Sequence, residues 1–299
     1  MKEKVLITGA GGLLAKNLGK VLIHSGYNIC YLSSNKKNLC SNIYYWNFKE
    51  NYIDKKALQN VDHVIHLAGY SISSQWTKKT KKLMKDSRIK TSQLIYNKFV
   101  NLKTYPKTFI SASAMGYYGF NQNGIKNEKE KPGTDWMAQL CVEWEDAADQ
   151  FTKLGSNVIK LRLPLILEKN AEILQKSLMS FYFGFGVVFS NGQQKFPWIH
   201  IKDVVRFIAF ALKHQKIKGV YNLASRDNIS HYQFINTIKK VKYKYSILIY
   251  MPQVLIKFLF FKKHVLLLNN ISLDTKKLQN EKFELNYPTI EKAIKNLLP

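Results

Sequence analysis

Val5-Leu6-Ile7-Thr8-Gly9-Ala10-Gly11-Gly12 runs from a short apolar segment into a glycine-rich turn, and this transition indicates the fold class. An apolar, β-branched run of this length is typical of a strand buried on both faces of a parallel sheet. After the turn, Leu14, Leu18 and Leu22 recur with the spacing of one helix face. Ile29-Cys30-Tyr31-Leu32 then predicts a second strand, which completes a β-α-β unit of about 30 residues.

The same alternation continues along the chain. Further strands are expected at Val64–Leu67, Thr108–Ser111, Asn157–Arg162 and Gly219–Leu223, with amphipathic helices between them. Such alternation predicts an α/β fold with a doubly wound parallel sheet of the Rossmann type. We expect residues 1–163, joined by about 203–225, to form a dinucleotide-binding domain. Residues 164–202 and 226–299 are expected to form a smaller substrate lobe.

The glycine-rich turn has the properties of a phosphate-binding loop. Gly9, Gly12 and Ala15 are spaced three apart, which suits a tight turn, a close approach of backbone to a pyrophosphate and close packing of helix on strand. The free N–H groups at the helix N-terminus add a partial positive charge. We therefore predict dinucleotide binding, with a purely structural loop as the alternative. The expected contacts are Gly9, Gly11, Gly12, Leu13 and Leu14.

The end of the second strand bears on the choice of dinucleotide. A carboxylate there would bind a ribose 2′-hydroxyl and favour NAD, but the sequence reads Leu32-Ser33-Ser34-Asn35-Lys36-Lys37, without an acid. NADP is therefore favoured over NAD, and Ser33, Ser34 and Lys36 are expected at its 2′-phosphate. The alternative, that the two lysines are ordinary surface residues, stays open. Asn47 is a candidate adenine contact.

The charge of the chain raises the question of nucleic acid. Its 299 residues include 46 Lys and Arg against 20 Asp and Glu, a formal net charge of +26. Arginines, on which base reading depends most, stand only at Arg88, Arg162, Arg206 and Arg226. No specific nucleic-acid partner is therefore expected, although a nucleic-acid binder remains the third alternative. The lysine excess reflects either compositional drift or a selected polyanion surface.

Cysteine usage and hydropathy bear on location. The chain's 3 cysteines form no C-x-x-C pair, so neither a metal site nor a disulfide framework is expected, and a reducing cytoplasm is the expected location. The start of the chain lacks the features of a secretory signal. The most apolar window, Ile247 to Phe261, is interrupted by Pro252, Gln253 and Lys257. A soluble protein with no membrane partner is therefore expected.

Several longer motifs, in order along the chain, point to a known superfamily. They are Thr8 to Ala15, Leu67-Ala68-Gly69, Asp86-Ser87-Arg88-Ile89, Ser111 to Gly119, Leu140 to Glu145, Trp198 to Asp203 and Asn286-Tyr287-Pro288-Thr289. Together they resemble the extended short-chain dehydrogenase/reductases of the sugar-nucleotide epimerase kind, and more closely an atypical branch called epimerase family proteins. The resemblance implies a Rossmann domain, bound NAD(P), and Leu67, Ala68, Gly69 and Arg88 among the cofactor contacts.

The resemblance also implies a catalytic Ser/Thr, Tyr and Lys. Ser113 matches the serine, but Met137 stands where the tyrosine belongs and Cys141 where the lysine belongs. Neither can do the proton chemistry, because a thioether has no proton and a neutral thiol has no positive charge. Tyr117 and Tyr118 are the expected substitutes, with packing on cofactor or substrate as their alternative role.

Arg88 and Arg162 have two expected roles, a pair with a substrate phosphate or the fixing of a loop through a carboxylate. Taken together, the residues predict an NADP(H)-binding oxidoreductase or epimerase. Its small-molecule substrate, a nucleotide sugar being one class, would present a hydroxyl or carbonyl. The rival is a catalytically impaired, cofactor-binding regulatory protein, favoured by the missing tyrosine and lysine. A homodimer is one oligomeric state that these features allow.

Overall fold

The computed structural model describes residues 2–120 and 122–299. The chain divides into two compact units, each assembled from three segments. Unit 1 comprises residues 1–114, 139–162 and 205–221, and unit 2 comprises residues 115–138, 163–204 and 222–299.

Unit 1 is built on a large sheet. In the described part of the chain this sheet has 8 strands in the order β12-β8-β6-β5-β1-β2-β3-β4. They are β1 (Lys4–Thr8), β2 (Asn28–Ser33), β3 (Ile43–Asn47), β4 (Tyr52–Ile53), β5 (His63–His66), β6 (Thr108–Ala114), β8 (Asn157–Leu163) and β12 (Gly219–Asn222). The central pairs β6-β5, β5-β1, β1-β2 and β2-β3 are parallel, whereas β4 pairs antiparallel with β3. The strand order reverses beside β1, as in doubly wound folds.

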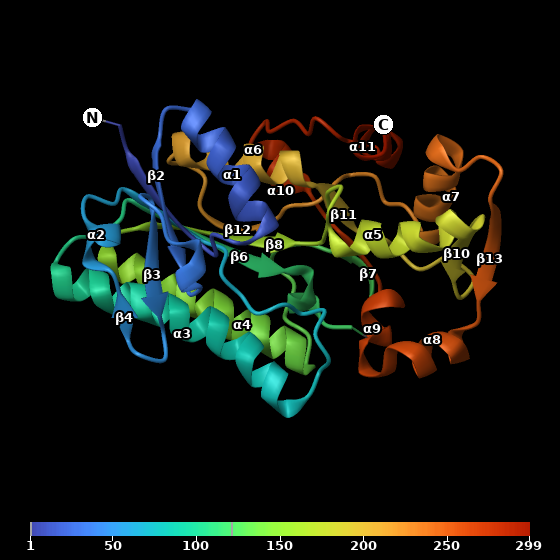
Figure 1. Ribbon diagram of the computed structural model, residues 1–299, viewed down its shortest axis with the longest axis horizontal. Coiled ribbons are helices and arrows are strands. Elements are labelled where there is room, and N and C mark those ends of the chain that lie inside the picture. The colour runs from blue at the N-terminus through green and yellow to red at the C-terminus, as the bar shows by residue number, and fades with distance from the viewer. Residues whose placement is uncertain (1, 121) are drawn as a thin grey trace. The chain divides into compact units, whose positions relative to one another are not determined.

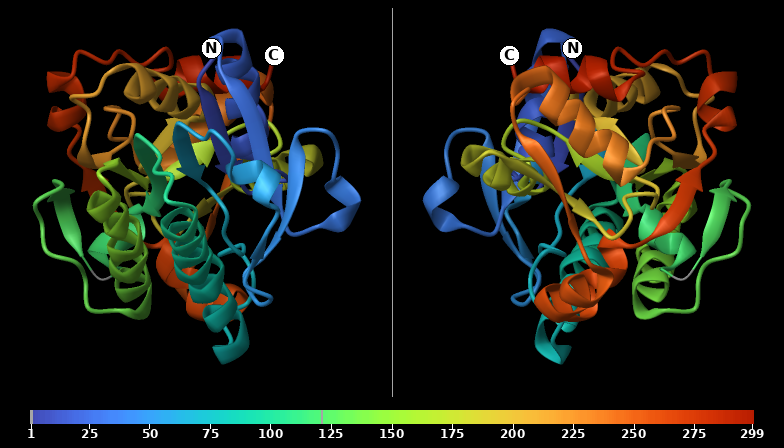
Figure 2. Two further views of the ribbon diagram at one scale, coloured as in Figure 1. Left: turned by 90° about the vertical axis from the view of Figure 1, so that its left-hand side faces the viewer. Right: turned by 90° about the vertical axis from the view of Figure 1, so that its right-hand side faces the viewer.

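Helices cover both faces of this sheet (Figures 1 and 2). They are α1 (Leu13–His24), α2 (Lys55–Leu58), α3 (Lys78–Leu102), α4 (Trp136–Asp149) and α6 (Ile201–Lys213). The long helices α3 and α4 lie side by side, and the Ser92 hydroxyl donates to the Ala147 carbonyl between them. Along β1, Leu6 packs into the core beneath α2, α3 and α4, and its neighbours Val5 and Ile7 are equally buried. An apolar run without alternation is what a strand covered on both faces requires.

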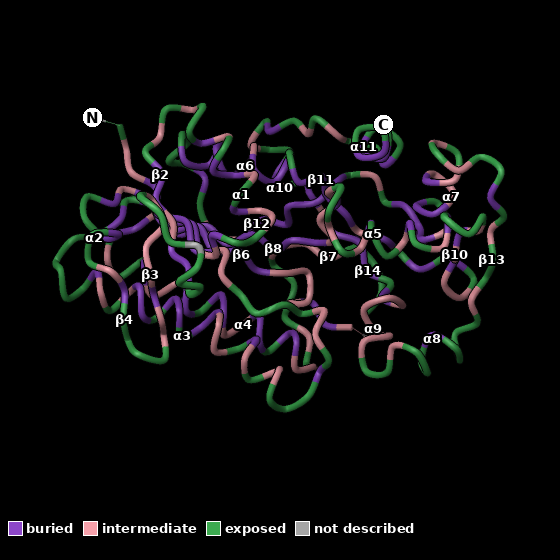
Figure 3. The backbone as a smooth tube through the Cα atoms, in the orientation of Figure 1, coloured by how far each residue is buried: buried purple, intermediate pink, exposed green. Residues whose placement is uncertain are grey.

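Unit 2 combines short sheets with helices. Its strand pairs are β7 (Asn123–Lys126) with β14 (Asn270–Leu273), β9 (Leu165–Leu167) with β11 (Trp198–His200), and β10 (Phe185–Phe189) with β13 (Ile247–Met251). The helices are α5 (Glu172–Met179), α7 (His231–Lys242), α8 (Gln253–Phe260), α9 (His264–Leu267), α10 (Lys276–Asn280) and α11 (Ile290–Leu297). Apolar residues of α5, α7 and α11 meet around Trp198 and Phe234 in one core, seen as buried segments in Figure 3.

Five short 3₁₀ turns complete the described structure, at Lys36–Asn38, Met115–Tyr118, Gln150–Leu154, Ser180–Phe183 and Phe261–Lys263. The α/β fold class with a large parallel sheet, predicted from the sequence, is confirmed. Residues 115–138, which the sequence assigned to the first domain, group with unit 2, where β7 pairs with β14. The division of labour between a cofactor domain and a substrate lobe stays a proposal. Within the described residues, no helix is long and apolar enough to span a bilayer.

Candidate functional site

The turn after β1 packs tightly against the loop after β5. Gly9 has a φ of +78°, and a Cβ atom there would lie 3.2 Å from the Ala68 Cα atom. Its amide and that of Ala10 donate to the Leu32 carbonyl at 3.2 and 3.3 Å, which ties the turn to β2 as well. Both the left-handed backbone and the close approach require glycine at this position.

The N-terminus of α1 is left without a side-chain cap. Gly12 is the N-cap residue in an extended conformation, and the first turn of the helix carries no acidic residue. The Gly12 amide donates to the Gly9 carbonyl at 2.8 Å, and a Cβ on Gly12 would lie 3.1 Å from that oxygen. Gly11 and Gly12 are exposed, and Leu13 and Leu14 are half-buried. Uncapped helical N–H groups next to a surface without side chains fit a diphosphate group.

The Thr8 hydroxyl fixes the β5 loop beside this turn. Its oxygen accepts from the amides of Leu67 and Ala68 at 3.0 and 2.9 Å and lies 3.0 Å from His66 Nδ1. Because both amides are donors, the hydroxyl proton is available to His66 Nδ1. His66 Nε2 lies 3.2 Å from the Arg88 carbonyl oxygen, which can only accept. His66 thus bridges Thr8 to α3 with its proton on Nε2.

His66 is a neutral histidine at ordinary pH. Burial lowers its pKa from 6.5 to about 4. Sequence reasoning missed both Thr8 and His66, since each looks like one more residue of a buried strand. The sequence signal that could have found them is that each is a polar residue directly after a buried strand segment. The two segments, Val5–Ile7 and His63–Ile65, pair in register.

Arg88 lies beneath the Gly69 loop. Its Nη1 atom donates to the carbonyls of Tyr70 and Met84, both at 3.0 Å. The guanidinium carbon lies 4.8 Å from the centre of the Trp144 ring, and a Cβ on Gly69 would come within 2.9 Å of it. Burial lowers the pKa of Arg88 to about 10, which leaves it charged at neutral pH. Arg88 therefore holds the loop through backbone carbonyls, an arrangement that neither expected role anticipated.

The end of β2 presents hydroxyl and amino groups. Ser33 is buried, and its hydroxyl is engaged with the backbone of Asn35, accepting from the amide at 3.1 Å. Ser34 and Lys36 are exposed, and the Lys36 ammonium lies 4.9 Å from the centre of the Tyr45 ring. Ser33 stands opposite Tyr45 in the β2-β3 register. Ser34 and Lys36 are thus among the exposed residues of this strand end, together with Asn35 and Lys37.

Asn47 is the last residue of β3. Its Nδ2 atom donates to the Tyr45 hydroxyl at 3.3 Å, and its Oδ1 atom accepts from the Lys49 amide at 3.0 Å. Asn47 therefore belongs to the same edge of unit 1 as Lys36 and Tyr45, because β2 and β3 are parallel neighbours.

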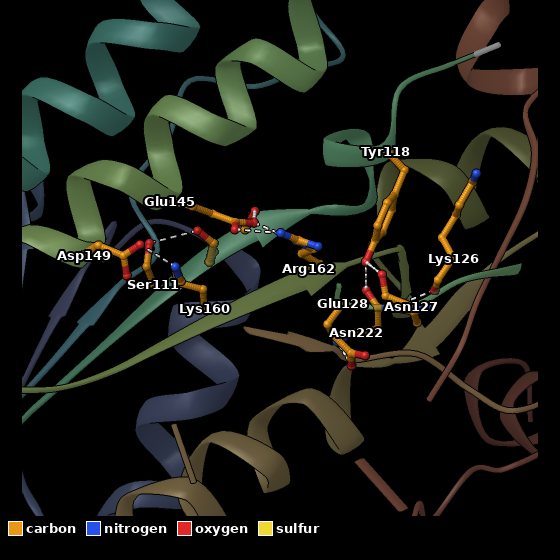
Figure 4. A network of polar contacts seen from close by, with 12 residues as sticks. Ser111, Tyr118, Lys126, Asn127, Glu128, Glu145, Asp149, Lys160, Arg162 and Asn222 are labelled. Atoms are coloured by element: carbon orange, nitrogen blue, oxygen red, sulfur yellow. Dashed lines mark hydrogen bonds and ion pairs between the residues drawn. The ribbon is translucent and has the colours of Figure 1, made fainter. Parts of the chain in front are cut away.

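Ser113 belongs to a buried polar cluster with Glu145 and Arg162, the two members that Figure 4 labels. Its hydroxyl donates to Glu145 Oε1 at 2.7 Å. Arg162 clamps the same carboxylate through two bonds, Nε to Oε1 at 2.8 Å and Nη2 to Oε2 at 2.9 Å. All three residues are at most 5% exposed. The sequence did not single out Glu145 as a partner of Ser113; the signal was a lone arginine at the end of an apolar strand, which needs a buried carboxylate.

The two residues at the missing Tyr and Lys positions are apolar in character. Met137 and Cys141 are 3% and 1% exposed. Burial raises the pKa of the Cys141 thiol to about 12, so this thiol carries no charge at neutral pH. Neither residue can exchange a proton with a ligand or stabilise an anion.

Tyr118 and Tyr117 belong to the 3₁₀ turn Met115–Tyr118 of unit 2. Tyr118 is 1% exposed, and its hydroxyl lies 2.7 Å from Asn222 Oδ1 and 3.1 Å from the Asn127 carbonyl (Figure 4). Asn222 is itself held, because its Nδ2 atom donates to the Lys126 and Asp274 carbonyls. Tyr117 is half-buried and packs edge-on against Tyr118. Tyr118 is therefore anchored in a structural network.

The expected cofactor contacts lie in unit 1, along the carboxyl ends of neighbouring parallel strands. Thr8 stands opposite Leu32, and His66 stands opposite Ser111, so the turns after β1, β2, β5 and β6 leave the same edge of the sheet. Ligands of open α/β sheets bind at such an edge, next to the point where strand order reverses.

Comparisons with known proteins agree with this architecture. A model of the NAD dependent epimerase/dehydratase family matches residues 5–224. The chain belongs to this family. The resemblance inferred from the sequence motifs is thereby confirmed.

Among relatives of this family member, the epimerase family protein ML0860 of Mycobacterium leprae is 30% identical over 78% of this chain and 75% of its own length. The epimerase family protein SAR0825 of Staphylococcus aureus is 27% identical over 99% of both chains. Among solved structures, human epimerase family protein SDR39U1 (isoform 2) with NADPH has a TM-score of 0.86 at 20% identity, covering 98% of both chains. UDP-glucose 4-epimerase of Thermotoga maritima with UDP-glucose has a TM-score of 0.78 at 19% identity, covering 98% of this chain and 96% of its own.

Proposed function

We propose that this family member binds NADP(H) in unit 1 and acts as an oxidoreductase or epimerase on a hydroxyl or carbonyl of a small molecule. This proposal rests mainly on the turn from Thr8 to Leu13, where an uncapped helix N-terminus follows three glycines, Gly9, Gly11 and Gly12, that leave the backbone without Cβ atoms. Diphosphates bind at such helix ends because several N–H groups converge there. The solved human relative, which contains NADPH, supports the same assignment.

The preference for NADP over NAD rests on the end of β2. No carboxylate follows Leu32, and Ser34 and Lys36 are exposed there. The Lys36 ammonium, packed over the Tyr45 ring, offers a positive charge for a 2′-phosphate. Asn47 and the Leu67, Ala68 and Gly69 backbone complete the proposed contact set, with Arg88 supporting the loop from beneath. UDP-glucuronic acid 4-epimerase of Bacillus cereus, a similar solved structure, contains NAD. NAD is therefore the alternative coenzyme for this chain.

The chemistry assigned to this chain is orientation and proton handling, while the nicotinamide coenzyme supplies a hydride acceptor or donor when bound. Because the Ser113 proton is donated to Glu145, the remaining lone pairs of Ser113 are suited to accept a hydrogen bond from a substrate hydroxyl. We assign the proton-transfer role to Tyr117, which is half-buried, rather than to Tyr118, which is 1% exposed. Nucleotide sugars are the proposed substrate class, as UDP-glucose is bound in the Thermotoga maritima relative.

Calorimetric titration with NADPH, NADP, NADH and NAD tests the binding part of this proposal. Gly12→Ala places a methyl group in the proposed diphosphate cradle, at a backbone conformation that alanine accepts. We expect it to weaken NADPH binding by about tenfold or more, roughly 1.4 kcal/mol. Lys20→Ala, an exposed change within the same helix, is the matched control and should bind as the unchanged protein does. Absence of heat with all four nucleotides would refute the proposal.

A second candidate is a cofactor-binding regulatory protein without turnover. It is favoured by the buried Met137 and Cys141, which leave the Tyr and Lys positions without proton chemistry. Single-turnover oxidation of NADPH by a panel of keto-sugars and small carbonyls separates the two. Consumption that falls on Tyr117→Phe supports the enzyme, whereas tight binding without consumption supports the regulator.

The proposal includes a reducing, cytoplasmic setting. Cys30, Cys40 and Cys141 are free thiols, which is the state that such a compartment maintains.

A further inference from the structure

Unit 2 exposes a cluster of large apolar side chains on β13, α8 and the residue after α8. We call it the α8 patch: Ile247, Ile249, Tyr250, Val254, Leu255, Phe258, Leu259 and Phe261. Val254, Phe258 and Phe261 are 80%, 70% and 71% exposed. In Figure 3 most of α8 and the adjoining end of β13 are drawn as exposed. Many large exposed apolar side chains within one short segment indicate an interaction site rather than ordinary surface composition.

The helix α8 is anchored on one side only. Among its residues, Ile256 is buried and Phe260 half-buried, while Val254, Leu255, Phe258 and Leu259 are exposed. At 3.6 residues per turn, the four exposed residues cover an arc of about 140°. A helix that packs on its unit through Ile256 and Phe260 and exposes its other apolar side chains is suited to lie at the surface of a second apolar medium.

The chain segment that carries the patch has charges of a single sign. The segment from residue 228 to 273 contains no aspartate or glutamate. Its lysines precede, interrupt and follow the patch along the chain, namely Lys239, Lys240, Lys242, Lys244, Lys257, Lys262 and Lys263. Lys257 lies within α8 and is exposed, as are Lys240, Lys242, Lys244 and Lys262. An apolar helix face with flanking lysines and no acid complements an anionic surface that is apolar just below its charges.

We propose that the α8 patch docks on the surface of an anionic lipid bilayer, with the exposed apolar side chains of α8 inserted among the lipids and the lysines at the head groups. A second copy of this chain is the poorer occupant. A symmetric contact would bring two acid-free, lysine-rich segments together, and each chain carries a net charge of +26. The sequence expectation of no membrane partner rested on the length needed to cross a bilayer, which surface docking does not require.

Vesicle flotation with the full chain tests this proposal. The probes are vesicles of phosphatidylcholine alone and vesicles containing about one third phosphatidylglycerol, at low and at high salt. We expect binding to the anionic vesicles only, weakened but not abolished by salt. Val254→Ser/Phe258→Ser should weaken it by about tenfold or more, because insertion scales with buried apolar surface. Lys257→Gln/Lys262→Gln should weaken it by about fivefold per lysine at low salt.

Matched controls separate docking through the patch from attraction by net charge. Ile125→Ser removes another 64% exposed side chain, on β7, and should bind vesicles like the unchanged protein. Lys20→Gln removes one exposed charge from α1 and should have little effect. Circular dichroism checks that the variants are folded. As a second measurement, tryptophan placed at Phe258 should be quenched by brominated lipid, whereas tryptophan placed at Ile125 should not.

Three results would overturn the proposal. Equal vesicle binding by the unchanged protein and Val254→Ser/Phe258→Ser would leave only unspecific surface charge. No vesicle binding, with a dimer in light scattering that Val254→Ser/Phe258→Ser dissociates, would assign the patch to a second copy. No vesicle binding by a monomer would direct the patch to an acidic protein surface.

Discussion

Ser113 donates its hydroxyl hydrogen bond to Glu145 Oε1 across 2.7 Å, inside the buried cluster that Arg162 completes. A serine at this strand end would ordinarily be free to donate to a ligand. Here its proton points into the protein, so the substrate contact proposed above uses Ser113 as an acceptor. In that proposal Glu145 and Arg162 are positioning residues for Ser113.

Loss of either charge of this cluster should destabilise the protein. Glu145→Ala leaves the Arg162 guanidinium buried, 2% exposed, without its carboxylate. We expect a loss of about 3–5 kcal/mol in the free energy of unfolding, measured in urea. The double variant Glu145→Met/Arg162→Met removes both charges and should recover most of that loss. Equal instability of the single and double variants would show that the pairing is not the source of the effect.

Stability should depend on the protonation of His66. Its pKa is about 4 in the folded chain and 6.5 without burial, so the unfolded chain binds more protons between these values. Stability from this group is therefore complete above pH 6.5 and declines as the pH falls toward 4, by roughly 3 kcal/mol at most. The free energy of unfolding, measured from pH 7.5 to 4, should fall less steeply with decreasing pH in His66→Gln than in the unchanged protein. Because His200 and His231 also have pKa values lowered to about 4 by burial, part of the slope will remain.

The Thr8 hydroxyl should be needed to hold the β5 loop. Thr8→Val keeps the shape but leaves the Leu67 and Ala68 amides without their acceptor, at a cost of about 1–3 kcal/mol per amide. Hydrogen exchange should accelerate at these two amides more than at the β5 core. Thr8→Ser, which retains the hydroxyl, should exchange nearly as the unchanged protein does. Unaltered protection in Thr8→Val would mean that other contacts hold the loop.

A carboxylate at the end of β2 should change the coenzyme preference. Ser34→Asp provides an acceptor for a ribose 2′-hydroxyl and repels a 2′-phosphate. The ratio of NADP to NAD affinity should fall by about tenfold or more, as measured by calorimetry. Asn28→Asp adds the same charge at the exposed opposite end of the strand and should leave the ratio unchanged. A similar fall in both variants would indicate general electrostatics.

The order of strands, turns and helices could be predicted from the sequence because it follows from local patterns. The apolar run Val5–Ile7, the glycines after it and the helix spacing from Leu14 each determine local structure independently, and all agree with one fold. Gly9 was predictable for the same reason, since its left-handed φ of +78° is a local requirement.

The partners of the site residues were not predictable, because they come from distant parts of the chain. Ser113 and Glu145 are 32 residues apart, and Thr8 and His66 are 58 apart. Such pairs depend on which strands become neighbours and in what register they pair. Local sequence patterns do not specify strand pairing or register. The environment of Tyr118 was hidden for the same reason, since it depends on Asn222, 104 residues away.

The chain passes between its two units after residues 114, 138, 162, 204 and 221. Neither unit is therefore a continuous piece that a single protease cut could release. A single cut at any of these five crossings divides at least one unit between two fragments.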